Sequence, residues 1–316
     1  MTVKLGVVMD AIQSISYKKD STFALLLEAQ SRHFELYYFE QKDLFLRDGI
    51  PYGNAKILKV FRDADTWFSF QAEKKIPLSE LQIILMRKDP PFNEQYIYTT
   101  YLLEYAERLG VFVMNRPQAL RDINEKIAIM EFPEYISQTL VTRSMKELQN
   151  FWKEQKDIVC KPLHAMGGFS VFRLQENEVN ANVIFQKLTE NETTEIMAQR
   201  FIPEIIKGDK RILMIDGEPF PHVLARIPQG EDWRGNLAAG AKGTVQMLSN
   251  RDQAICALVG PFLKKHGLYF VGLDVIGDYL TEINVTSPTG IRELESALQV
   301  NISGLLFDKV EKYLKK

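Results

Sequence analysis

The alternation of short apolar runs with segments of helical spacing restricts the fold more than any other feature of this 316-residue sequence. It occurs twice in the first third of the chain, in segments 5–9, 21–31 and 35–39 and again in segments 83–86, 96–109 and 111–114. Strand–helix–strand units place their strands parallel in one sheet. We therefore predict an N-terminal α/β domain with a small parallel sheet at 1–122. Residues 49–75 mix Gly, Pro and charge without a sustained period, which indicates an irregular excursion rather than a core element.

The rest of the chain predicts two further domains of α/β and α+β type. Residues 139–200 alternate strands with helices around a glycine loop, which favours a small central lid over 123–202. The last third predicts strands at 211–215 and 220–225, a helix at 252–266 and a hairpin at 269–284. We assign 203–316 to a C-terminal domain with a mixed sheet and a flexible loop at 227–242.

The charge balance excludes several classes of partner. Lys and Arg number 39 against 41 Asp and Glu, so the net charge of −2 provides no field that would gather nucleic acid or an anionic membrane. The apolar runs are far shorter than the roughly 20 residues that cross a bilayer. The strand-like first ten residues do not resemble a signal peptide. Cys160 and Cys256 form no CxxC pair, so we expect buried reduced thiols and a cytoplasmic protein.

The predicted hairpin at 269–284 carries three oxygen-bearing side chains, Asp274, Glu282 and Asn284. Side chains alternate between the faces of a strand, so Glu282 and Asn284 share a face. A three-residue turn at 277–279 sets Asp274 opposite Glu282, whereas a two-residue turn at 277–278 sets Asp274 opposite Thr281. The apolar pattern of the two strands favours the first register.

Two carboxylates and an amide oxygen form a hard-oxygen set that suits Mg²⁺ and leaves room for phosphate oxygens. A solvated hairpin edge is the alternative. The metal interpretation is favoured because Asn284 leads into a turn at 285–290 ahead of a helix, where free N–H groups can hold an anion.

A second signal is the stretch 160–170, where a strand delivers Lys161 and then the pair Gly167 and Gly168. Glycines allow backbone N–H groups to approach phosphate closely, although most glycine pairs are ordinary turns. Lys126 could grip a triphosphate from the other side; the alternative for either lysine is a surface charge. Neither a Walker loop nor a GxGxxG turn is present.

Cations gather between 200 and 242. After the strand at 196–199, segment 200–203 could pair its backbone with a purine edge, or could simply end the strand. Four cations follow near Asp209, which indicates an anionic substrate; they are Arg211, Arg226, Arg234 and Lys242. The long loop at 227–242 favours a lid. In the first domain, Arg87 follows a strand end, where open α/β sheets place ligands, and could meet a substrate carboxylate.

Taken together, these motifs resemble the ATP-grasp ligases, in Lys126, the 161–170 loop, Asp274 and the stretch 282–288. Within that group the chain resembles the prokaryotic glutathione synthetase family, through the stretches 86–92, 226–230 and 234–240. The resemblance spans essentially the whole sequence.

This resemblance implies ATP-dependent condensation of γ-glutamylcysteine with glycine through an acyl phosphate, with two Mg²⁺ ions (Mn²⁺ as a substitute) and a homotetramer. It implies nucleotide contacts from Lys126, Lys161, Gly167, Gly168, Gln199, Arg200, Ile202, Asp209 and Arg211. It implies metal ligation by Asp274, Glu282 and Asn284, and catalytic roles for Arg211, Arg226 and Arg234. Substrate contacts would come from Arg87, Arg226, Asn284, Ser287 and Thr289.

Other functions remain open at this point. A D-alanine–D-alanine ligase or a peptide-tail glutamate ligase would share the ATP and metal residues and differ only in substrate contacts. A regulatory ATP-binding module such as synapsin has a related fold and serves binding, but an intact metal site argues against it.

Overall fold

A computed structural model describes residues 2–230, 232–235 and 240–315. The N-terminal sheet contains β1 (Lys4–Met9), β2 (Glu35–Phe39), β3 (Leu44–Arg47), β4 (Ile50–Val60), β5 (Phe68–Pro77), β6 (Ile83–Arg87) and β7 (Phe112–Met114). The central sheet contains β8 (Thr139–Thr142), β9 (Ile158–Pro162), β10 (Phe172–Leu174) and β11 (Ile196–Arg200). The C-terminal sheet contains β12 (Asp209–Ile215), β13 (Glu218–Ile227), β14 (Lys242–Met247), β15 (Phe270–Ile276) and β16 (Tyr279–Asn284).

The helices include those that the periodicity predicts. They are α1 (Ser21–Ser31), α2 (Glu94–Arg108), α3 (Pro117–Asp122), α4 (Met145–Gln155), α5 (Ala181–Leu188), α6 (Asn250–His266), α7 (Ile291–Leu298) and α8 (Ile302–Leu314). Side-chain caps fix several starts: Asp20 accepts from the Phe23 N–H and Ser249 forms a capping box with Asp252. No helix in the described part of the chain has the length and apolar character that crossing a bilayer requires.

The N-terminal sheet has the predicted parallel centre and an antiparallel extension. Strands β2, β1, β6 and β7 are parallel neighbours, and β3, β4 and β5 add to the edge beyond β2. The expectation that residues 49–75 lie outside the core was wrong, because Ala55, Leu58 and Val60 of β4 are buried. A register shift between Lys56 and Leu58 breaks the period-two pattern of β4, which hides this strand from sequence analysis.

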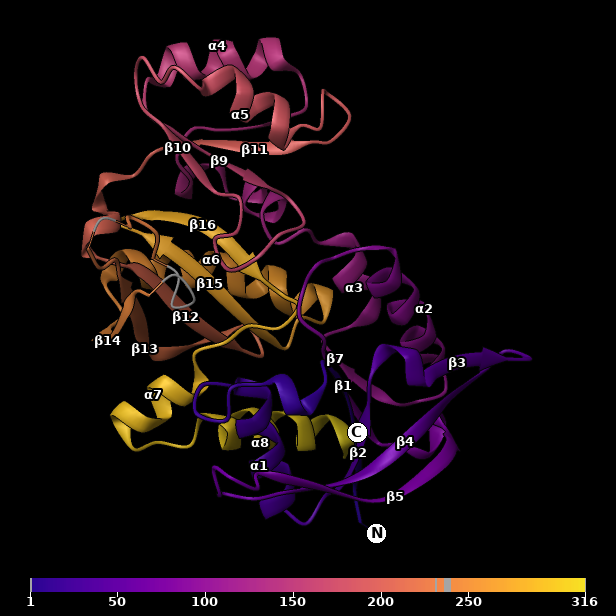
Figure 1. Cartoon of the computed structure of the whole chain (residues 1–316). Helices are drawn as coiled ribbons and strands as arrows, with labels where there is room; N and C mark the ends of the chain where they lie inside the picture. Colours follow the sequence, from indigo (N-terminus) through magenta and orange to yellow (C-terminus); the bar gives the residue numbers. More distant parts are fainter. Residues whose placement is uncertain (1, 231, 236–239, 316) are drawn as a thin grey trace.

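The other two sheets are antiparallel throughout. The central sheet has the order β10-β9-β11-β8, and α4 and α5 lie against it at the top of Figure 1. The C-terminal sheet has the order β14-β13-β12-β15-β16, rather than the expected mixture of directions. The pairs β12–β13 and β15–β16 are hairpins with short turns, which require antiparallel pairing.

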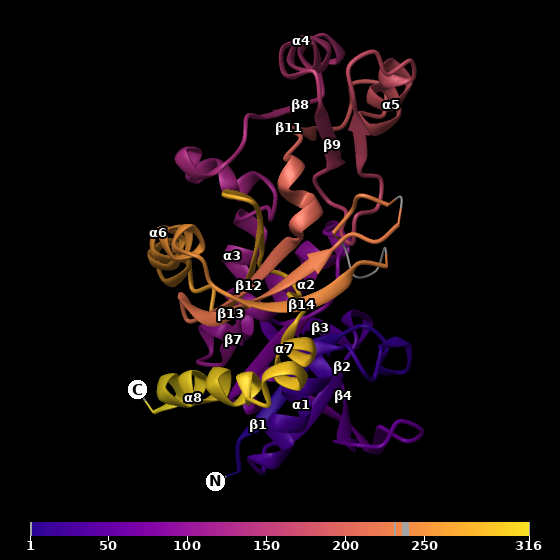
Figure 2. The same ribbon diagram turned by 90° about the vertical axis from the view of Figure 1, so that its left-hand side faces the viewer.

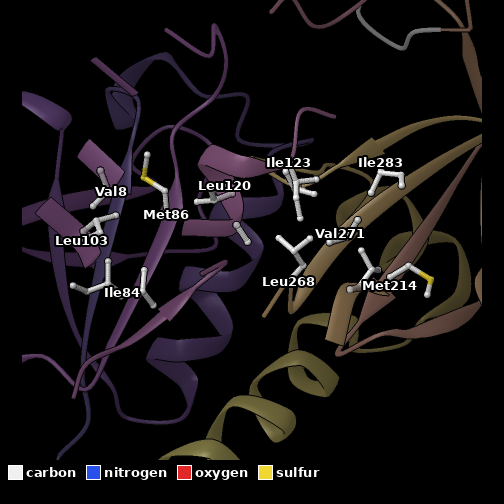
Figure 3. Close-up of a cluster of buried hydrophobic side chains, with 14 of the residues drawn as sticks. Val8, Ile84, Met86, Leu103, Leu120, Ile123, Met214, Leu268, Val271 and Ile283 are labelled. Atoms are coloured by element: carbon white, nitrogen blue, oxygen red, sulfur yellow. The ribbon is translucent and has the colours of Figure 1, made fainter. Parts of the chain in front are cut away.

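The N-terminal and C-terminal sheets share one hydrophobic core. Figure 3 shows Ile84 and Leu120 from the N-terminal side facing Leu268 and Val271 from the C-terminal side. Asn115 fixes the same junction, because its buried amide donates to the Phe270 and Val285 carbonyls, both at 2.7 Å, and accepts from the Tyr269 and Phe270 N–H groups. These two sheets therefore form one base for the site.

The last two helices return to the N-terminal part of the molecule. Helices α7 and α8 lie beside α1 in both ribbon views, and Phe307 of α8 meets Phe34 edge-on at 5.7 Å (Figures 1 and 2). We propose domains at 1–122, 123–202 and 203–316 because each range contains one sheet, with the end of the third covering the first.

Candidate active site

The β15–β16 hairpin brings Asp274 opposite Glu282. The predicted three-residue turn was wrong: Ile276 pairs with Tyr279 across a two-residue turn, and Val275 pairs with Leu280. A bulge then leaves Thr281 unpaired, and its hydroxyl donates to the Asp274 carbonyl at 3.1 Å. The extra residue restores the pairing of the two carboxylates that the apolar pattern predicted.

Asp274 lies at the centre of a buried ion network. Arg211 binds its carboxylate with two parallel hydrogen bonds of 2.5 and 2.9 Å, and Arg226 approaches it to 3.0 Å. Arg226 also binds Asp209 at 2.5 Å. Burial acts to raise the pKa of Asp274, but Arg211 and Arg226 outweigh it and hold the pKa below its usual value. Burial raises the pKa of Asp209 to about 7, although Arg226 opposes the shift.

Two lysines border Glu282. The Lys126 ammonium lies 2.9 Å from the Glu282 carboxylate and donates to the Ala165 carbonyl at 2.6 Å. The Lys161 ammonium donates to the Thr281 carbonyl at 3.2 Å, and burial lowers the pKa of Lys161 to about 8. The lysines thus connect the glycine loop and β9 to the β15–β16 hairpin.

The two lysines, Asp209, Asp274 and Glu282 line an open cleft between the central and C-terminal sheets, with about 860 Å³ of space that includes open solvent. Eight of the nine predicted nucleotide residues line it: Lys126, Lys161, Gly167, Gly168, Gln199, Arg200, Ile202 and Asp209. Asp274, Glu282 and Arg234 line it as well, whereas the ninth residue, Arg211, is buried against Asp274.

Three of the five predicted substrate residues, Arg87, Ser287 and Thr289, lie at the 285–290 turn. Arg87 donates to the Pro288 carbonyl at 2.9 Å, and the Ser287 hydroxyl donates to the Arg87 carbonyl at 3.4 Å. Arg211 donates to the Thr289 carbonyl at 3.4 Å, which joins this turn to Asp274. Arg87 is buried without an ion-pair partner among the described residues, and burial lowers its pKa. Arg226 lies apart from this turn, on β13, where it contacts Asp209 and Asp274.

The loop at 227–242 contacts the glycine loop through Arg234. The Arg234 guanidinium donates to the Gly168 carbonyl at 3.0 Å and to the Asp232 carboxylate. The lid prediction falls partly on Glu231 and on 236–239, which lie outside the described residues. Lys242 begins β14 as an exposed residue and is not brought to the cleft.

Two features of this region carry little signal in the sequence. Phe201 and Trp233 meet edge-on at 5.8 Å and both line the cleft, which provides an aromatic wall. The only signal for this wall was that Phe201 lies within the predicted connector at 200–203. Glu125 contacts the residues that follow β16, and its position beside Lys126 was the only available signal.

The oxygen atoms that the hairpin side chains present are of the type that binds a divalent cation. Asp274 and Glu282 supply carboxylates, and the Asn284 amide donates to the Gly272 carbonyl at 3.0 Å, which leaves its oxygen available as a ligand. The described residues contain no group of three or more His, Cys, Asp or Glu side chains arranged for metal binding. Non-protein ligands such as phosphate oxygens would therefore have to complete the coordination.

Comparison with known proteins shows which family the chain is similar to. The model of the prokaryotic glutathione synthetase N-terminal domain matches residues 3–121, and that of the ATP-grasp domain of the same family matches residues 125–299. Glutathione synthetase from Pseudomonas aeruginosa is 54% identical over 310 residues, with 98% of each chain covered. The Escherichia coli enzyme is 51% identical over 314 residues, with 99% of each chain covered.

Solved structures share the fold at low sequence identity. D-cycloserine synthetase DcsG superposes with a TM-score of 0.69 at 14% identity, covering 98% of this chain and 99% of that one. The macrocyclase MdnC, bound to its precursor peptide, gives 0.62 at 16% identity, covering 98% and 100%. The fold and the cleft define an ATP-grasp ligase, which uses ATP to form a C–N bond. Within that class the chain belongs to the prokaryotic glutathione synthetase family.

Proposed function

We propose that this ligase joins γ-glutamylcysteine to glycine and releases glutathione, ADP and phosphate. The observation that carries the proposal is the identity of 51 to 54% to glutathione synthetases over nearly the full chain. The geometry agrees with it, because a cleft lined by lysines and arginines opens directly onto a paired-carboxylate hairpin.

The cleft walls have distinct roles toward ATP. Lys126 and Lys161 would neutralise phosphate charge, and Gly167 and Gly168 would let backbone N–H groups approach it. Gln199, Arg200 and Ile202 lie where β11 ends and would border the purine, with Asp209 near the ribose. A cation about 4 Å from a phosphate charge contributes roughly 4 kcal/mol at an effective dielectric near 20, so two lysines in a partly enclosed cleft matter for affinity.

Asp274, Glu282 and Asn284 would hold two Mg²⁺ ions, with Mn²⁺ as a substitute. Bound ions would supply the positive charge that neutralises the phosphate oxygens during transfer. In the structure Asp274 forms ion pairs with Arg211 and Arg226, and Glu282 forms an ion pair with Lys126. Metal binding therefore competes with these side chains, and a displaced Arg226 would be free to contact the substrate.

The reaction proceeds in two displacements. The cysteinyl carboxylate of the dipeptide attacks the γ-phosphorus, the bond to the β-phosphate oxygen breaks, and ADP leaves. The glycine amine then attacks the acyl carbon, the acyl–oxygen bond breaks with loss of phosphate, and the amine proton passes to solvent. Arg211, Arg226 and Arg234 would stabilise the developing negative charge, and positioning would supply much of the remaining rate.

The dipeptide would bind along the 285–290 turn. There the Arg87 guanidinium donates to the Pro288 carbonyl, the Ser287 hydroxyl donates to the Arg87 carbonyl, and Arg211 donates to the Thr289 carbonyl. A buried arginine without a protein counterion suits a substrate carboxylate. Glycine would enter beneath the 227–242 loop, which we propose closes as a lid to exclude water from the acyl phosphate.

A coupled assay of ADP release tests this function. ADP formation that requires both γ-glutamylcysteine and glycine supports it. ADP formation with D-alanine alone would point to a D-alanine–D-alanine ligase, and tight ATP binding without turnover would point to a regulatory module. We also propose a cytoplasmic homotetramer on the basis of the family; sedimentation at four times the subunit mass tests the assembly.

A further inference from the structure

Glu125 lies in the segment that connects the N-terminal domain to the central sheet, and no role described above uses it. One of its carboxylate oxygens accepts three hydrogen bonds, from the Val285 N–H at 2.7 Å, the Thr286 N–H at 2.8 Å and the Thr286 hydroxyl at 2.8 Å. Its backbone carbonyl accepts from the Ile283 N–H at 2.8 Å. A single residue thus holds the chain on both sides of Asn284.

The neighbours of Glu125 hold the opposite wall of the cleft. The Asn124 amide donates to the Leu163 carbonyl at 3.2 Å, and the Lys126 ammonium donates to the Ala165 carbonyl. Lys126 also pairs with Glu282. Residues 124–126, which we term the bracket, therefore join the glycine loop to the end of β16. Among the hydrogen bonds of the described residues, those from the bracket to the chain beyond Asn284 all involve Glu125.

The direction of the chain after β16 depends on this carboxylate. Strand pairing ends at Asn284, so the Val285 and Thr286 N–H groups have no partner in the sheet. Glu125 supplies the acceptor for both and so sets where Ser287 and Thr289 lie relative to Asp274. A non-accepting side chain would leave two partly buried donors unsatisfied, and the turn would move to satisfy them.

We propose that Glu125 is a positioning residue for the peptide substrate: its carboxylate orients the 285–290 turn, while the rest of the bracket holds the phosphate side. The proposal rests on the proposed function. It predicts an asymmetric effect, because loss of Glu125 removes the contacts to the turn and leaves those of Asn124 and Lys126 to the glycine loop.

The test compares two variants of similar shape, Glu125→Met and Glu125→Gln, in the full-length enzyme. Met cannot accept the hydrogen bonds, so we expect the KM for γ-glutamylcysteine to rise about tenfold or more, with the KM for ATP within about twofold of wild type. Gln retains an accepting oxygen, so Glu125→Gln should recover most of the loss. Equal losses in both variants, an unchanged dipeptide KM in Glu125→Met, or an equal rise in the KM for ATP would each overturn the proposal.

A third variant and a second measurement test the proposal if Glu125→Met does not fold or if no substrate is turned over. Thr286→Val removes one of the three donors with little change in shape, so we expect a rise of about threefold in the dipeptide KM; this variant decides the matter if Glu125→Met does not fold. Amide exchange needs no substrate. In Glu125→Met, amide exchange at Val285 and Thr286 should accelerate at least about tenfold. In Thr286→Val, exchange at position 286 should accelerate by a smaller factor. Unchanged exchange overturns the proposal.

The same experiments separate the two proposals. Wild-type enzyme that makes no ADP with both substrates overturns the proposed function, and the exchange measurement then decides alone whether Glu125 fixes the turn. Active wild-type enzyme with a normal Glu125→Met variant overturns only the role of Glu125.

Discussion

The Arg211 guanidinium and the Asp274 carboxylate face each other across β12 and β15, where Arg211 is the register partner of Asp274. Arg226 reaches the same carboxylate from β13, so Asp274 is enclosed by two cations in a buried environment. Arginine is suited to this contact because its planar fork matches a carboxylate with two parallel hydrogen bonds.

Asp274→Asn should lower kcat about 100-fold or more and change the KM values for ATP and dipeptide little. The amide keeps the shape but removes the charge that orients Arg211 and Arg226 and that we propose binds metal, and both effects matter most in the transition state. Steady-state kinetics check this. Asp278→Asn, at the exposed turn of the same hairpin, is the matched control; a comparable loss there would remove the special role of Asp274.

Affinity for ATP should fall as pH rises through the pKa of Lys161, about 8. The ammonium is charged below that pH and neutral above it, so we expect kcat/KM for ATP to drop about tenfold between pH 7 and pH 9. Lys161→Arg stays charged and should flatten the profile. The effect on stability has the opposite sign: since the pKa of Lys161 in the folded protein lies below the usual lysine value of 10.5, Lys161 should add stability as pH rises from about 8 to about 10.5. A wild-type profile identical to that of the arginine variant would contradict the assignment.

Arg234→Ala should uncouple ATP use from ligation. Loss of the contact to the Gly168 carbonyl separates the two loops above the cleft, so water reaches the acyl phosphate more easily. We expect more ADP formed per glutathione, measured by following both products in one reaction. Gln229→Ala serves as the control, since within the described part of the chain its side chain hydrogen-bonds to the Ile227 and Pro228 carbonyls alone. An unchanged product ratio in Arg234→Ala would argue against a lid role.

Asn115→Ala should destabilise the fold by about 3 kcal/mol or more. The change leaves four buried backbone groups of Tyr269, Phe270 and Val285 without partners at the junction of two sheets. Urea denaturation measures the loss. Asn54→Ala, at an exposed position of β4, should stay within about 0.5 kcal/mol of wild type.

The spacing of apolar residues predicted most of the helices and strands, because that spacing is set within each segment. Helix α1 was predicted at its exact bounds and α2 within two residues, since amphipathic spacing needs no information from distant residues. Strand β4 was missed because its bulge breaks that spacing.

The sequence by itself determined which residues carry oxygen and charge: Asp274, Glu282 and the lysines were identifiable from residue type and spacing. The tertiary structure decided how they meet. The turn has two residues rather than the predicted three, and the bulge at Thr281 compensates by placing Asp274 opposite Glu282. Glu125 and Asn115 contact residues that lie more than 150 positions away in the sequence. Such contacts depend on the packing of separate sheets, and no period along the chain encodes that packing.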